Sequence, residues 1–134
     1  MPVEPLTAER GLLDTSVFIA QEGGRVLGAL PAAAAISVVT VAELHLGVLM
    51  ADRAAVRARR LRTLTSVQRL FEPLPADSEV ARAFAEIVAQ ARREGRRPKI
   101  MDSWIAATAV AHDLPVYTQD DDFLTIPGVR VVRV

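Results

Sequence analysis

Apolar runs and stretches of helical apolar spacing alternate along the chain, and this pattern predicts an α/β domain. Short apolar runs predict strands at 11–13, 35–39, 116–118 and 129–134. Helical spacing predicts helices at 15–20, 40–50, 53–69, 77–91 and 102–112, with a helical turn at 122–124. Strands separated by helices usually run parallel with right-handed crossovers. We therefore expect a three-layer α/β/α fold around a small, mostly parallel sheet.

Residues that begin and end helices refine these boundaries. Asp77 is expected to cap a helix that Gly95 and Pro98 end. Thr40 and Glu43 match a capping box, S/T-x-x-E, which would open the second helix. That helix is apolar on nearly every side, so either the monomer core or a partner protein must cover it. Residues 70–74 could add a strand, which their prolines would confine to a sheet edge.

Composition narrows the class of protein. The 134 residues are 51% hydrophobic and 4% aromatic, which suits one domain over 1–134, with an aliphatic core from about residue 11. The chain has no cysteine, which excludes a disulfide scaffold, a thiolate zinc site and a cysteine nucleophile. The first ten residues lack a basic, apolar leader, and the mostly apolar stretch 29–42 is too short to span a bilayer. We expect a cytoplasmic protein.

Four acidic residues follow predicted strands or open predicted helices: Asp14, Glu43, Asp102 and Asp120. The carboxyl ends of parallel strands share one sheet edge, so these side chains should meet in one cleft. Two carboxylates about 5 Å apart repel by roughly 3 kcal/mol at an effective dielectric near 20. A hard divalent cation would relieve this repulsion, and without it at least one acid should have a raised pKa. Taken singly, each acid could also be a cap or turn residue.

The zero formal charge, from 16 basic and 16 acidic residues, conceals a segregation of sign. Basic residues gather at 53–69 and 92–99, whereas acidic residues gather at 120–122. Basic flanks around an acidic centre suit a polyanion that is held by its backbone and attacked at a metal. Two solvated helix faces would give the same pattern. The candidates for contact with an RNA backbone are Arg57, Arg60, Arg96, Arg97 and Lys99.

Four segments resemble the ordered acidic motifs of PIN-domain ribonucleases. They are L-L-D-T-S-V-F-I at 12–19, V-A-E-L at 41–44, D-S-W-I-A-A at 102–107 and T-Q-D-D-D-F at 118–123. The length resembles that of the toxin subunits of bacterial VapBC toxin–antitoxin pairs. The resemblance covers about residues 11–134. It implies a metal-dependent endoribonuclease that forms a homodimer and is inhibited by a cognate antitoxin.

The same resemblance assigns roles by position. Asp14, Glu43, Asp102 and Asp120 match the family's four catalytic acids. Mg²⁺ or Mn²⁺ would be held by Asp14, Asp102 and Asp120, with Glu43 and Asp122 as further candidates. The number of metal ions stays open. It also stays open which of the three consecutive acids at 120–122 contacts the metal directly. Water activated by the metal would attack phosphorus and leave a 5′-phosphate. Thr15, Ser16 and Thr118 lie beside the acids and could orient them or a bound water.

Three other functions stay open at this stage. His45 and His112 could cleave RNA without metal by general acid and base catalysis. Asp14 could be the nucleophile of a phosphohydrolase, although Ser16 stands where such enzymes have a second acid. The acids could also hold a structural ion in an RNA-binding module without turnover. The target RNA and the identity of the antitoxin cannot be read from the sequence.

Overall fold

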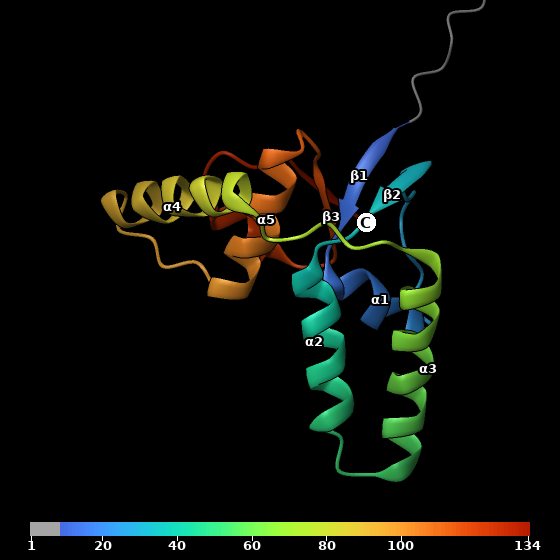
Figure 1. The fold of residues 1–134 in the computed structure, drawn as a ribbon. Coiled ribbons are helices and arrows are strands. Elements are labelled where there is room, and N and C mark those ends of the chain that lie inside the picture. Colours follow the sequence, from blue (N-terminus) through green and yellow to red (C-terminus); the bar gives the residue numbers. More distant parts are fainter. Residues whose placement is uncertain (1–8) are drawn as a thin grey trace, which may run out of the picture.

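The computed structural model describes residues 9–134, in which a parallel sheet lies between two groups of helices (Figure 1). The expectation about an N-terminal leader concerns residues 1–8 and so lies outside this range. The strands are β1 (Arg10–Leu13), β2 (Ala33–Ala35), β3 (Val116–Thr118) and β4 (Val131–Arg133), in the order β2-β1-β3-β4. Every neighbouring pair is parallel. The helices are α1 (Thr15–Glu22), α2 (Val38–Leu49), α3 (Ala54–Leu70), α4 (Ser78–Arg93), α5 (Ile100–Ala111) and the 3₁₀ helix η1 (Asp121–Thr125).

Successive side chains of the two central strands enter different cores, and this alternation explains why helices cover both faces of the sheet. Leu12 of β1 and Val116 of β3 belong to the core that α4 and α5 complete. Leu13 and Tyr117, one residue further along, belong to the core that α1, α2 and α3 complete. The predicted α/β/α fold is thereby confirmed. Within the described residues, none of the helices has the length and apolarity needed to cross a membrane.

The second strand ends, and the second helix begins, earlier than predicted. The Ser37 hydroxyl caps α2 by accepting the Val39 N–H at 3.0 Å. The β-branched residues at 38–41 therefore lie in a helix, although their intrinsic preference is for strands. The capping box proposed for Thr40 and Glu43 is wrong, because both residues lie inside the helix. Their side chains are free to make tertiary contacts.

Two further boundaries bear on the acidic residues. Asp77 caps α4 as predicted, accepting the Val80 N–H at 3.0 Å. In contrast, α5 begins at Ile100, so Asp102 lies in its first turn and does not open the helix. A carboxylate in the first turn is favoured by the positive end of the helix dipole. The strand proposed at 70–74 is reduced to a single bridge between Ser37 and Leu74.

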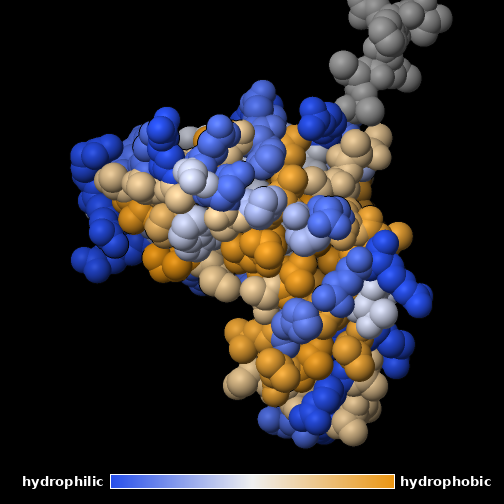
Figure 2. Space-filling view, in the orientation of Figure 1, coloured by the Kyte–Doolittle hydropathy of each residue, from blue (hydrophilic) through white to orange (hydrophobic). Residues whose placement is uncertain are grey.

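Helices α2 and α3 form an arm that projects away from the sheet (Figure 1). On α2 only Thr40 and Leu44 are buried. Apolar side chains lie exposed along the arm, and Figure 2 shows the apolar surface there. We call four of these residues the arm surface: Leu46, Leu49, Met50 and Leu61, which are 55, 76, 68 and 50% exposed. The monomer core therefore covers only one side of α2, which leaves a partner as the expected cover for the exposed side.

Candidate active site

Asp14 lies beside Thr118 where β1 and β3 end. The Asp14 N–H donates to the Tyr117 carbonyl at 2.9 Å, which extends the pairing of these strands to the edge of the sheet. Asp14 Oδ2 accepts the Thr118 hydroxyl at 3.0 Å and the Ser16 N–H at 3.4 Å. Burial raises the pKa of Asp14, and these hydrogen bonds oppose the rise. The carboxyl group is thus buried and held in place by residues from two different strand ends.

Glu43 reaches the same sheet edge from α2. The Thr15 hydroxyl donates to Glu43 Oε1 at 2.7 Å, and the Thr15 oxygen lies 3.0 Å from the Thr40 hydroxyl. These contacts join the start of α1 to α2 across 25 and 28 residues of sequence. Burial raises the pKa of Glu43, with the Thr15 hydrogen bond opposing it and the charges of Asp14 and Asp120 adding to it. Glu43 is therefore electrostatically coupled to the acids that follow the strands.

Asp102 approaches from α5, on the opposite side of the sheet. The residue is 8% exposed, and its Oδ2 is the one buried side-chain oxygen among the described residues that has no hydrogen-bond partner. Burial, followed by the charges of Asp14, Glu43 and Asp122, raises the pKa of Asp102 to about 7. One acid therefore has a raised pKa, as predicted, but burial is the largest cause and like-charge repulsion is a smaller one.

The three consecutive acids at 120–122 have different surroundings. Asp120 lines a cleft of about 530 Å³ together with Glu43. Asp121 instead pairs with Arg133 of β4. Asp122 Oδ2 accepts a hydrogen bond from Lys99 Nζ at 2.8 Å, and this bond is the main reason that the pKa of Lys99 is raised. Asp120 is thus the member of the run that lines the cleft, while Asp122 is paired with Lys99.

The oxygen donors at this edge suit a hard divalent cation. Asp102 Oδ2 lacks a partner, and burial, with a smaller contribution from neighbouring carboxylates, raises the pKa values of Asp14, Glu43 and Asp102. In the described part of the chain, no three His, Cys, Asp or Glu side chains are already grouped around one point. Mg²⁺ usually keeps several waters and takes only one or two direct carboxylates, so it does not require such a group.

The basic residues singled out from the sequence divide between two places. Arg57 donates to the Ala51 carbonyl at 2.9 Å, and Arg60 donates to the Gly47 carbonyl at 2.7 Å, so both tie α3 to the end of α2. Arg60 also lines the cleft that contains Glu43 and Asp120. Arg96 and Arg97 line a separate pocket between α4 and α5. Lys99 lies between that pocket and the acids.

Sequence reasoning did not single out two basic residues of the cleft. Arg25 lies after α1 and Arg59 lies on α3, and both line the cleft with Arg60. Arg59 Nε is 3.3 Å from Glu22 Oε2, which anchors its side chain beside α1. Arg59 belongs to the arginine run at 53–69, where only the fold separates residues facing the cleft from those facing solvent. Arg25 is an isolated basic residue directly after the turn at Gly23 and Gly24, and no sequence signal marks it.

The histidines and the tryptophan lie elsewhere. His45 and His112 are exposed, and neither lines the cleft. The nearest polar partner of His45 is Gln68, at 3.4 Å, and His112 follows the last turn of α5. This separation argues against a paired acid and base at the acidic edge. Trp104 is stacked on Phe84 with a centroid distance of 4.0 Å, so its ring packs between α4 and α5.

A comparison with known families and proteins agrees with this geometry. The PIN domain family model matches residues 11–129. The chain belongs to the PIN-domain family. Ribonuclease VapC5 of Mycobacterium tuberculosis is 48% identical over 96% of this chain and 98% of its own length. Ribonuclease VapC4 of the same organism is 45% identical over 96% of this chain and all of its own length. These two relatives place this PIN domain among the VapC ribonucleases.

Solved structures agree with the sequence relatives. The crystal structure of VapBC-5, a toxin–antitoxin system of Mycobacterium tuberculosis, contains a chain with a TM-score of 0.85 and 47% identity. That match covers 93% of this PIN domain and 98% of the solved chain. The structure of FitAcB from Neisseria gonorrhoeae matches with a TM-score of 0.69 and 32% identity, over 90% of this PIN domain and 94% of the solved chain. The fold and the family are therefore shared along nearly the whole chain.

Proposed function

We propose that this PIN domain is the toxin of a type II toxin–antitoxin pair and a metal-dependent endoribonuclease. It cuts RNA phosphodiester bonds and leaves 5′-phosphate ends, and it acts in the cytoplasm. The observation that carries the proposal is the convergence of Asp14, Glu43, Asp102 and Asp120 on one sheet edge, with the pKa of Asp102 raised to about 7. The names of its relatives, ribonucleases VapC5 and VapC4, support the reaction class.

The surroundings of each acid suggest whether it binds the metal or accepts a proton. Asp14 and Asp102 would hold Mg²⁺ or Mn²⁺, because both are buried and Asp102 Oδ2 lacks another partner. Asp120, which is exposed in the cleft, would join through water. Such an ion, when bound, polarises a phosphate oxygen and lowers the pKa of a water molecule. Glu43 is held by the Thr15 hydroxyl at a position where it can accept a proton from an attacking water.

Three hydroxyl-bearing residues orient this set. Thr118 fixes Asp14, and its own oxygen accepts the Asp120 N–H at 2.9 Å, so one side chain positions two of the acids. The Ser16 hydroxyl accepts the Gln119 N–H at 2.9 Å and holds the segment leading to Asp120 against α1. Thr15 holds Glu43. Groups of this kind usually matter for metal affinity and activity, because they fix the direction of the ligands.

Positive charge around the acids supports a polyanionic substrate. Arg25, Arg59 and Arg60 line the cleft on one side, and Lys99 lies beside Asp122 on the other. Arg57 would act indirectly, because its hydrogen bond to the Ala51 carbonyl fixes the end of α2, the helix that carries Glu43. An RNA strand could therefore meet cations on both sides of the acids. Arg96 and Arg97 extend the positive surface beyond Lys99.

The arm surface is our candidate for protein partners. Its exposed leucine and methionine side chains form an apolar area of the kind that marks protein interfaces. The related structure VapBC-5 is a member of the VapBC family of toxin–antitoxin systems. We therefore place the cognate antitoxin on the arm, and expect the toxin to form a homodimer. An antitoxin segment there would also lie next to the cleft, since Gly47 and Arg60 belong to both the arm and the cleft.

The test compares cleavage of single-stranded, structured RNA by the wild-type protein and by Asp102→Asn, each with Mn²⁺ and with excess chelator. Asp52→Asn is the matched control, because Asp52 is an exposed acid outside the cleft. We expect 5′-phosphate ends from the wild type and the control with Mn²⁺, and loss of cleavage with chelator or Asp102→Asn. Cleavage that survives both treatments would refute the metal-dependent site. If the acids instead hold a purely structural ion, the chelator should unfold the protein, and no RNA should be cleaved under any condition.

A further inference from the structure

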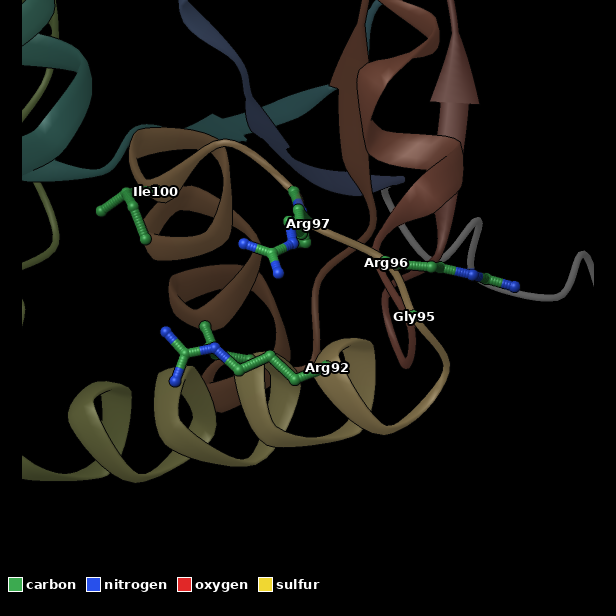
Figure 3. A pocket seen from close by; sticks show the side chains of 7 residues that line it. Arg92, Gly95, Arg96, Arg97 and Ile100 are labelled. Atoms are coloured by element: carbon green, nitrogen blue, oxygen red, sulfur yellow. The ribbon is translucent and has the colours of Figure 1, made fainter.

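A basic pocket lies outside the acidic edge, between the end of α4 and the start of α5 (Figure 3). Its volume is about 490 Å³, which lies within the range of small-ligand sites. Three arginines, Arg92, Arg96 and Arg97, line it, together with the side chains of Val88, Pro98 and Ile100 and the backbone of Gly95. No carboxylate is among these lining residues. The pocket therefore combines concentrated positive charge with an apolar wall.

The arginines of this pocket do not all face the same way. Figure 3 shows Arg92 and Arg97 extending to the side on which Ile100 lies, whereas Arg96 extends to the opposite side. Arg96 Nη1 is 3.4 Å from the Thr125 carbonyl, so that guanidinium is turned towards η1. Among the described residues, no ion pair involves Arg92 or Arg97. These two guanidinium groups keep their donors available for an anion.

The chemistry of the pocket suits one nucleotide of a nucleic acid strand. Paired guanidinium groups match the oxygens of a phosphate, to which they can donate two parallel hydrogen bonds. Ile100 is 54% exposed and, with Pro98, offers an apolar surface to a sugar or base. A free inorganic anion would contact the arginines but not the apolar wall, whereas a nucleotide would contact both.

The pocket is close to the acids along the chain. Arg97 is two residues from Lys99, and two residues span at most about 7 Å. Lys99 Nζ donates a hydrogen bond to Asp122. Its positive charge also opposes the rise in the pKa values of Asp102 and Glu43 that burial causes. Lys99 is therefore within electrostatic reach of the acids and next to the pocket. A strand leaving the acidic edge along Lys99 would arrive at Arg97.

We propose that Arg92 and Arg97 bind a phosphate of the substrate RNA outside the scissile bond, with Pro98 and Ile100 against the attached nucleoside. This inference rests on the proposed ribonuclease function and adds a substrate requirement to it. The RNA must continue as a single strand beyond the cut, on the side that passes Lys99. A substrate that is bound at the acidic edge and is too short to reach the pocket would lose this contact, and its cleavage would not depend on Arg92 or Arg97.

The test measures binding of fluorescent single-stranded RNA in excess chelator, so that no cleavage is needed. The probes are a random-sequence 12-mer and a trinucleotide, and the affinity is measured by anisotropy over a range of salt concentrations. The double variant Arg92→Gln/Arg97→Gln is compared with Arg82→Gln/Arg93→Gln. The control removes the same amount of charge from exposed positions of α4, and neither Arg82 nor Arg93 lines the pocket.

We expect the double variant to bind the 12-mer roughly tenfold or more weakly than the control does. Its slope of log affinity against log salt should be less steep than the control's by about 0.7, because the two arginines contact one phosphate and each phosphate contact on a single strand contributes about 0.7. The trinucleotide should also bind the double variant more weakly than the control, because it contains the phosphate and nucleoside that the pocket would accept. An unchanged slope, or an equal loss in the control, would overturn the proposal. So would intact RNA binding combined with loss of antitoxin binding, which would assign the pocket to a protein.

Failure of this inference can be told apart from failure of the proposed function. If the wild type cleaves RNA but the double variant keeps the control's salt slope, only the inferred phosphate site is wrong. If no RNA is cleaved with Mn²⁺ while the slopes differ as expected, the pocket binds RNA and the ribonuclease proposal is wrong. Unfolding of each variant by urea checks that the exposed substitutions leave the fold intact.

Discussion

Replacing Asp102 by Asn should remove a large part of the pH dependence of stability in the metal-free protein. The pKa of Asp102 is raised from 3.8 to about 7 in the folded state. A shift of about 3 units corresponds to roughly 4 kcal/mol, at about 1.4 kcal/mol per unit. Because the raised value belongs to an acid, the folded state binds the proton more tightly than the unfolded state does. Stability is therefore highest when both states are protonated, and it falls as the pH rises from about 4 to about 7.

The measurement is urea unfolding of the wild type and Asp102→Asn at several pH values between 5 and 8, with excess chelator. The wild type should lose roughly 2–3 kcal/mol over this interval because of Asp102 alone, since part of the loss has already occurred below pH 5. The fall in the free energy of unfolding of Asp102→Asn over the same interval should be smaller by that amount. The Asn amide has its own hydrogen-bond needs, which could cost about 1–3 kcal/mol, but this cost is the same at every pH. The difference between the two pH profiles therefore isolates the ionisation.

Metal provides the second half of this test. Saturating Mn²⁺ should stabilise the wild type at pH 8 by about 2.7 kcal/mol when its concentration is 100 times the dissociation constant. Asp102→Asn should gain much less, because it lacks the carboxylate whose Oδ2 has no other partner. Asp52→Asn, an exposed acid outside the cleft, should behave like the wild type. Identical pH profiles of wild type and Asp102→Asn in chelator would refute the reasoning about burial and crowding at this residue.

Two further predictions concern the residues around the site. Thr118→Val should destabilise the protein by about 1–3 kcal/mol and raise the pKa of Asp14 further, because it removes the hydroxyl that contacts both Asp14 and the Asp120 N–H. Urea unfolding and a pH titration followed by NMR would check both effects, and an unchanged Asp14 titration would contradict them. Leu49→Glu in the arm surface should weaken antitoxin binding by at least tenfold, with unfolding unchanged within about 0.5 kcal/mol, because Leu49 is 76% exposed. Calorimetric titration with the antitoxin would test this, and undiminished binding would remove the arm from the interface.

The sequence by itself determined the fold class and the strand ends that carry the acids. Alternation of apolar runs with helical spacing depends only on neighbours in the chain, so β1, β3, α4 and the cap at Asp77 could be located from it. The acids after β1 and β3 could be assigned to one edge because parallel strands end together. A raised pKa of one acid was also expected from this argument, but its largest cause, the burial of Asp102, depends on tertiary packing.

Tertiary structure decided where the local signals were ambiguous. Residues 38–41 were predicted to be the end of a strand and the cap of a helix, but the Ser37 hydroxyl accepts the Val39 N–H and α2 begins at Val38. Glu43 therefore lies one turn into α2 and accepts the Thr15 hydroxyl. Only the fold distinguished Asp120 in the cleft from Asp121 beside Arg133 and Asp122 beside Lys99, because three consecutive acids carry the same local signal. The cleft position of Arg25 and the exposure of the arm surface likewise depend on contacts between residues far apart in the sequence. Such contacts arise when helices pack, and a pattern of neighbouring residues does not encode them.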